Sequence, residues 1–107
     1  MMTAKQARAA YRLLTVLAFS DLTLPKRVSI VVNPRLRKVW GYYYARPHRI
    51  EINSHVTDGT LLLRVMAHEM CHAVLETSAA SDHHKHDMQF KRLARKIMHR
   101  MGWKDDI

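Results

Sequence analysis

The sequence contains a single cysteine, only three glycines and three prolines, and half as many acidic as basic residues. Because Cys71 stands alone, an internal disulfide and a four-cysteine zinc site are both excluded. The few glycines and prolines leave no low-complexity tract or linker. A chain of 107 residues with an ordinary hydrophobic share of 48% fits one folded domain. We therefore expect a single domain over residues 1–107.

The N-terminal stretch MMTAKQARAAYRLLTVLAFSD lacks the features of a membrane or export segment. Its apolar run is too short to span a bilayer and is interrupted by Arg12. No small-residue cleavage site of the kind that ends a signal peptide follows it. With the lone cysteine, this favours a cytoplasmic protein that makes no membrane contact, and we expect a monomer.

Acidic residues are scarce relative to basic ones. Nine Asp and Glu stand against 18 Lys and Arg, which gives a formal charge of +9 and a pI near 10.2. Such an excess favours a polyanionic partner, because basic side chains release counterions from phosphates. DNA is the partner that we expect, which would make the protein nucleoid-associated. The alternative is a solvated basic surface, and a DNA-binding face would require the last helix to line up with Arg8, Arg12, Arg35 and Arg37.

The hydrophobic pattern predicts helices at both ends and strands between them. Helical periodicity covers residues 3–19, 60–79 and 87–101, and β-favouring runs cover 28–32, 39–47 and 48–54. Thr57 or Asp58 is the expected cap of the middle helix, and Asp87 of the last. The order predicts an α+β protein in which an N-terminal helix, a three-stranded antiparallel sheet and two further helices pack with the helices on one side.

The stretch LLLRVMAHEMCHAVLE, residues 61–76, places two histidines four residues apart. His68 and His72 then project from one face of a helix, where two imidazoles can bind one zinc ion. Glu69 follows His68 directly and can take a proton from water as a general base. Burying these side chains unpaired in so apolar a helix would be costly. The alternative is a pair of surface histidines beside a solvated glutamate.

A catalytic zinc needs a third protein ligand. Glu76 lies about 12 Å of helix rise from His68, too far for both to bind one ion. The loop that follows offers several candidates, namely His83, His84 and His86, with Asp82 and Asp87 as carboxylate alternatives. Cys71, inside the motif, could be read as a redox switch or ligand, but a lone cysteine on an apolar helix is more often a small core residue.

The segment HEMCH, followed fourteen residues later by HDMQF, resembles the SprT-like zinc metallopeptidases, the group that includes Spartan. Their pattern is H-E-x-x-H and then H-G-x-x-F at the start of the next helix. By that pattern His86 matches the third ligand and Phe90 matches the aromatic that anchors the helix. The upstream stretch KVWGYYYARPHRIEINSHV is similar to the family's strand pair, so the resemblance covers residues 28–101. Asp87 departs from it, because the family usually has glycine there.

The resemblance implies a zincin-like minimal metalloprotease domain with Zn²⁺ held by His68, His72 and His86 and Glu69 as the general base. It further implies a protein substrate on or crosslinked to DNA. Two alternatives remain open: a small intracellular zincin that cleaves a regulatory protein such as a repressor, and a catalytically weak, zinc-containing DNA-binding module. The presence of Glu69 counts against the second, since a purely structural metal needs no base.

Overall fold

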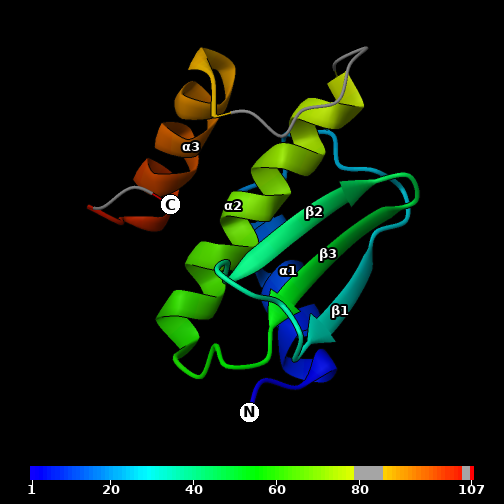
Figure 1. Ribbon diagram of the computed structural model, residues 1–107. Coiled ribbons are helices and arrows are strands. Elements are labelled where there is room, and N and C mark those ends of the chain that lie inside the picture. The colour runs from blue at the N-terminus through cyan, green and yellow to red at the C-terminus, as the bar shows by residue number, and fades with distance from the viewer. Residues whose placement is uncertain (79–85, 105–106) are drawn as a thin grey trace.

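The computed structural model describes residues 1–78, 86–104 and 107. Three helices and three strands follow in the predicted order (Figure 1). They are α1 (Ala4–Leu17), β1 (Ser29–Asn33), β2 (Gly41–Ala45), β3 (His48–Asn53), α2 (Gly59–Ser78) and α3 (Met88–Met101). The α+β class is therefore confirmed. Within the described residues, no helix combines the length and the apolar content needed to cross a membrane.

The first helix begins at a capping box and buries one face. The Thr3 side chain accepts a hydrogen bond from the Gln6 backbone N–H, and the Gln6 side chain accepts one from that of Thr3. Ala7, Ala10 and Leu14 are buried, and α1 packs against both α2 and β1. Leu17, the last residue of the helix, is 53% exposed.

The sheet is mixed, so the prediction of a fully antiparallel sheet was wrong. Its strand order is β1-β3-β2, with β3 in the centre. The short break at Arg46 and Pro47 does return β2 antiparallel to β3, with Ala45 opposite His48. On its other side, however, β3 pairs parallel with β1, with Ile30 opposite Ile50. The antiparallel prediction rested on the pairing of consecutive strands. Of the consecutive strands, β2 and β3 pair, whereas β1 and β2 do not.

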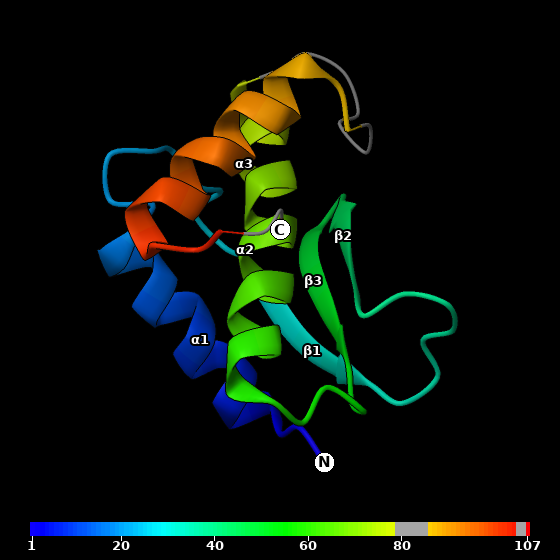
Figure 2. The same cartoon turned by 90° about the vertical axis from the view of Figure 1, so that its left-hand side faces the viewer.

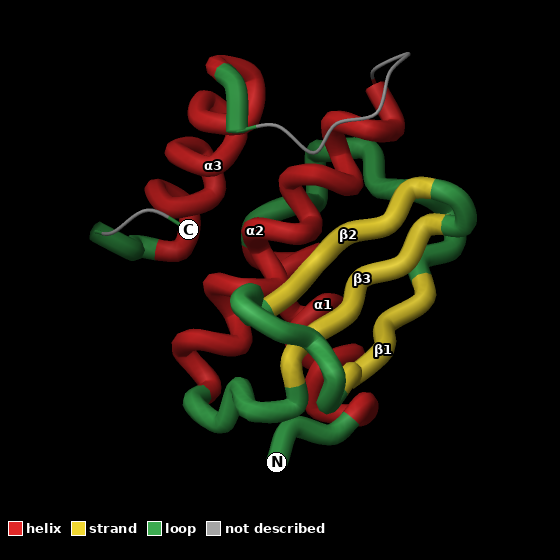
Figure 3. The backbone as a smooth tube through the Cα atoms, viewed as in Figure 1, coloured by secondary structure: helices red, strands yellow, loops and turns green. Residues whose placement is uncertain are grey.

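The loop between β1 and β2 explains the topology. Residues 34–40 carry the chain past the end of β3, as Figure 3 shows. Asn53, the last residue of β3, holds this loop: its backbone N–H donates to the carbonyl of Trp40 (2.8 Å) and its side-chain amide to that of Val39 (3.1 Å). These bonds hold β2 on the far side of β3, so β3 and not β2 pairs with β1.

Helix α2 lies between the sheet on one side and α1 and α3 on the other (Figure 2). Because it packs against neighbours on several sides, it is apolar around most of its circumference. Its buried hydrophobic residues are Leu62, Val65, Met66, Ala67, Met70, Cys71, Ala73 and Val74. Cys71 is fully buried, and burial raises the pKa of its thiol, as expected of a small core residue.

Both α2 and α3 begin at an aspartate cap. Of the two predicted caps of α2, Asp58 is the one used: its Oδ1 accepts from the backbone N–H groups of Thr60 (2.7 Å) and Leu61 (3.1 Å). Asp87 caps α3, as predicted, by accepting from the N–H of Phe90 (3.0 Å). The caps fix where each helix starts, and with it the side chains of its first turns.

Candidate metal site

His68 and His72 project from the same face of α2, as their spacing predicted. Their ring centroids lie 5.1 Å apart. His72 is only 4% exposed, whereas His68 is half-buried. The apolar packing around α2 thus fixes the direction of both side chains before any ligand binds.

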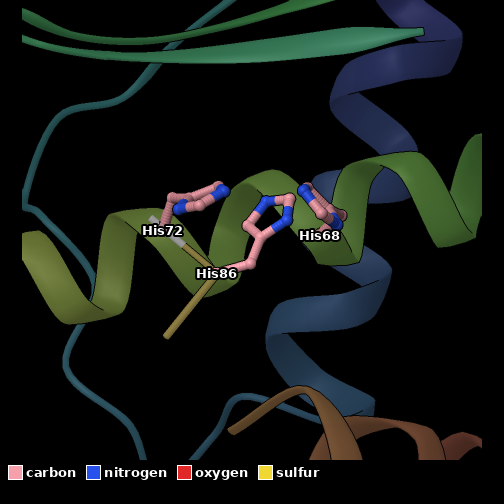
Figure 4. A group of neighbouring side chains, drawn as sticks. All are labelled: His68, His72 and His86. Carbon is pink, nitrogen blue, oxygen red and sulfur yellow. The ribbon is translucent and has the colours of Figure 1, made fainter. Parts of the chain in front are cut away.

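His86 reaches these two histidines from the segment just before α3. Its ring centroid lies 4.7 Å from that of His68 and 5.2 Å from that of His72. Figure 4 shows the His86 ring between the other two. Each residue offers a ring nitrogen, and the three nitrogens lie within 4.8 Å of one another. Of the alternative third ligands, Asp87 instead caps α3, while Asp82, His83 and His84 lie outside the described residues.

Phe90 packs against all three imidazoles. Its ring centroid lies 4.9 Å from that of His68, 4.5 Å from that of His72 and 4.6 Å from that of His86. Phe90 is 3% exposed and belongs to the buried face of α3. It therefore joins α3 to α2 at the point where the histidines meet, and supports the exposed His86 from behind.

The three histidines fit a zinc ion. Two nitrogens bound to one tetrahedral zinc ion lie about 3.4 Å apart, since each Zn–N bond is about 2.1 Å long. The nitrogens here lie within 4.8 Å of one another, so ring rotations that move each nitrogen by about 1 Å would bring them to this spacing. The pKa of His68 is lowered, first by burial and also by the nearby His86, although a backbone hydrogen bond to Ile107 acts in the opposite sense. A lowered pKa favours the neutral imidazole, which is the form that binds metals.

Glu69 is buried beside these histidines, with 6% of its surface exposed. Burial raises its pKa to about 8, because a carboxylate is poorly solvated there. Glu69 can therefore hold or release a proton in the neutral range, as a general acid and base must.

Gly41, at the start of β2, lets this strand lie directly against α2. A Cβ there would come within 2.7 Å of Val65 Cγ1 and 3.4 Å of Glu69 Cγ. Any other residue would push against the helix beside Glu69. No role was predicted for Gly41 from the sequence, although a glycine within an otherwise aromatic strand is a known sign of close backbone approach.

A pocket of about 430 Å³ opens beside His68 and Glu69, between β2 and the first half of α2. Most of its lining is apolar. Besides His68 and Glu69, the pocket is lined by Val39, Trp40, Gly41, Leu61, Arg64, Val65 and Ile107. The Arg64 guanidinium lies over the ring of Trp103, 5.6 Å from its centroid. This pocket could not be predicted from sequence patterns, because its walls come from three separate parts of the chain.

The basic residues do not form one continuous face. On α3, Lys91, Arg92, Arg95 and Lys96 are exposed, whereas Arg100 donates both to the Asp21 carboxylate (2.6 and 2.8 Å) and to the Ala18 carbonyl (2.7 Å). The loop that carries Arg35 and Arg37 lies on the sheet side of α2, and α3 lies on the opposite side (Figure 2). The alignment of α3 with Arg35 and Arg37 that a wider DNA-binding face would require is therefore not met, and a DNA contact of α3 would depend on its own four exposed cations.

Fold and site together define an α+β protein in which a candidate three-histidine metal site adjoins a buried glutamate. The family model described as the SprT-like family matches residues 7–105. The chain belongs to the SprT-like family. A relative from Staphylococcus carnosus (strain TM300), named "Protein SprT-like", is 36% identical over 81 residues, which cover 73% of this chain and 53% of the relative. The chain thus spans about half the length of the curated relative that it matches. No solved structure matches it significantly.

Proposed function

We propose that this protein is a zincin-like zinc metalloprotease that cleaves peptide bonds of proteins associated with or crosslinked to DNA. We further propose that it acts as a monomer in the cytoplasm. The observation that carries the proposal is the meeting of His68, His72 and His86, with ring nitrogens within 4.8 Å, beside the buried Glu69. Membership of the SprT-like family supports the same chemistry.

The histidines and the glutamate have separate roles in this proposal. His68, His72 and His86 would hold zinc. When bound, zinc supplies Lewis acidity, which polarises a peptide carbonyl and makes water more acidic. Glu69 accepts the proton of the attacking water and later passes it to the leaving amine. Its burial keeps this proton close to the reacting atoms and away from bulk water.

The substrate would lie along α2 beside the outer edge of β2. In the described chain no other strand pairs with that side of β2, because β2 is an edge strand of the sheet. An extended peptide can therefore add to this edge and pass the histidines and Glu69. The pocket beside Glu69 would then accept one of its side chains. Because the substrate would bind in an extended conformation, we expect cleavage in unfolded or flexible regions of a protein.

The proposed link to DNA depends on charge. The formal charge of +9 attracts polyanions in general, and the exposed cations of α3 lie on the helix that His86 precedes. DNA bound along α3 would hold an attached protein close to the site. A regulatory protein such as a repressor is the alternative substrate, and it would require no such contact.

The substitution Glu69→Gln tests the mechanism. We expect the variant to keep its zinc and to lose cleavage of a DNA-bound protein by about 10²- to 10⁴-fold, the usual contribution of a general acid and base. Zinc content is measured by atomic absorption and folding by circular dichroism. Removal of zinc from the wild type with a chelator should abolish cleavage, and added zinc should restore it. Normal cleavage by Glu69→Gln would refute the mechanism.

The same assay with and without DNA tests the substrate. We expect DNA to raise the rate of cleavage, and added salt to reduce this effect because it competes for the phosphates. If DNA leaves the rate unchanged and the protein shows no salt-sensitive DNA binding, the nucleic-acid part of the proposal fails. A regulatory protein then becomes the better candidate substrate. Zinc binding without any cleavage would instead favour the catalytically weak DNA-binding module.

A further inference from the structure

A second pocket, of about 750 Å³, opens at the other end of the α2 and β2 pair. Its walls come from the loop before β1, the turn between β2 and β3, and the last turn of α2. They comprise Pro25, Lys26, Arg27, Ala45, Arg46, Pro47, His48, Glu76 and Thr77. None of these residues has a role in the proposed mechanism.

The two pockets lie on opposite sides of the histidines. The first pocket is lined by Gly41, at the start of β2, and by Glu69 on α2. The second is lined by Ala45, at the end of β2, and by Glu76 near the end of α2. Between His72 and Glu76, α2 rises about 6 Å, and an extended peptide advances about 3.3 Å per residue. A substrate lying beside β2 would therefore place a side chain in the second pocket about two residues from the scissile bond.

The second pocket is cationic, unlike the first. Lys26, Arg27 and Arg46 are exposed, and none of them forms an ion pair within the described part of the chain. Glu76 is the one carboxylate in the lining, and the carboxyl end of α2 adds about half a negative charge. Three cations outweigh both, so the pocket keeps a positive surplus that suits a carboxylate.

We propose that this cationic pocket binds an acidic side chain of the protein substrate, an aspartate or glutamate about two residues from the scissile bond. The inference rests on the proposed function, because it takes the α2 and β2 groove as the peptide-binding site. A side chain suits the pocket better than a nucleic acid strand, because its cations converge from two loops on one depression at the end of a groove. A strand would need cations spaced along an extended surface.

Peptide binding to the zinc-loaded Glu69→Gln variant tests this without turnover. Two fluorescent peptides of equal length would be compared by anisotropy, one with aspartates on one side of the central bond and one with asparagines there. We expect the acidic peptide to bind about fivefold to tenfold more tightly, as suits two exposed ion pairs. Adding Arg27→Glu and Arg46→Glu should remove the preference. The matched reversal of Lys5 and Arg8, exposed on α1, should leave it intact.

The outcomes separate this proposal from the proposed function. Equal affinity of the two peptides, or a preference that survives Arg27→Glu and Arg46→Glu, overturns the acidic subsite. If those substitutions instead weaken binding of single-stranded DNA and leave the peptide preference unchanged, the pocket binds phosphates and the proposal is equally wrong. A wild-type protein that binds the acidic peptide selectively but never cleaves it refutes the protease and leaves the subsite standing.

Discussion

The two helices that meet at the candidate metal site are held in place in different ways. Helix α2 contacts α1, β2, β3 and α3, and most of its residues are buried. Helix α3 packs on α2 and buries one face, through Phe90, Ala94 and Ile97. Its start depends on the Asp87 cap, and its end on the ion pair between Arg100 and Asp21. The site therefore combines two histidines on a rigid helix with one on a less constrained segment.

Substitutions on the two helices should therefore affect the metal site differently. A change on α2 must disturb the core before it moves His68 or His72. A change at the start of α3 can move His86 while the rest of the fold persists. The spacing of His68 and His72, four residues apart on one helix, was therefore enough to predict that they lie together. The position of His86 depends instead on how α3 packs against α2. Substitutions at the two helices and at their contacts can test this contrast.

Replacing one histidine from each segment should give the largest effect. His72→Ala leaves His68 and His86 on separate elements, and we expect it to bind no zinc at stoichiometric concentration. His86→Ala leaves the pair on α2 in place, so weak zinc binding should persist. His99→Ala, on the exposed side of α3, serves as the control and should bind zinc normally. Isothermal titration of the metal-free proteins measures this, and equal affinity of His86→Ala and wild type would disprove the assignment of His86.

Gly41→Ala tests the packing of β2 against α2. The added methyl group would lie 2.7 Å from Val65 Cγ1, so the strand or Glu69 must shift. We expect cleavage to fall about tenfold or more, because small displacements of catalytic groups are costly, while zinc content stays normal. The stability loss should be about 1–3 kcal/mol, as is usual for overpacking.

Gly59→Ala is the matched control for this experiment. Gly59 starts α2, and an added Cβ there meets no atom within 4 Å. Its activity and stability should match those of the wild type, measured by peptide cleavage and urea denaturation. Full activity in Gly41→Ala would show that contact between β2 and Glu69 has no role in the reaction.

The two aspartate caps allow a direct comparison of the helices. Asp58→Ala and Asp87→Ala should each cost about 1 kcal/mol of stability, the usual value for a lost cap. Only Asp87→Ala should also weaken zinc binding, by a few fold, since it frees the turn that follows His86. Urea denaturation and zinc titration measure the two effects. Equal loss of zinc affinity in both variants would contradict the idea that α3 alone is loosely held.

Asp21→Asn should have the smallest effect, and it should depend on pH. The hydrogen bonds from Arg100 are the main cause that lowers the pKa of Asp21 to about 2. Because this pKa lies below the usual value of 3.8, the ion pair stabilises the fold above about pH 4, and this contribution is lost as the pH falls toward 2.

Urea midpoints of wild type and Asp21→Asn measure this contribution. The wild type should exceed the variant at pH 7, and the difference should shrink steadily between pH 4 and pH 2. Zinc affinity at pH 7 should be the same in both proteins, because Asp21 lies at the far end of α3 from His86. A difference that grows at low pH would show that the ion pair is not its cause.

The order and type of the helices and strands, and the pairing of His68 with His72 on α2, could be predicted from the sequence. These features depend on local patterns: apolar residues at helical or strand spacing, aspartates as caps, and histidines four apart. The resemblance to SprT-like proteins added His86 and Phe90, and the structure brings both to His68 and His72. In each case the informative residues lie in one stretch of the chain, which for the metal site runs from His68 to Phe90.

The strand pairing in the sheet and the groove beside β2 depend on contacts between distant segments, which the sequence does not reveal. The parallel pairing of β1 with β3 depends on Asn53 holding residues 34–40, a contact between segments that no periodicity records. The close approach of Gly41 to Val65 also joins segments that are distant in the sequence. So does the cationic pocket, whose walls come from three parts of the chain. A sequence shows what each segment tends to form, but the free energy of packing selects which distant segments meet.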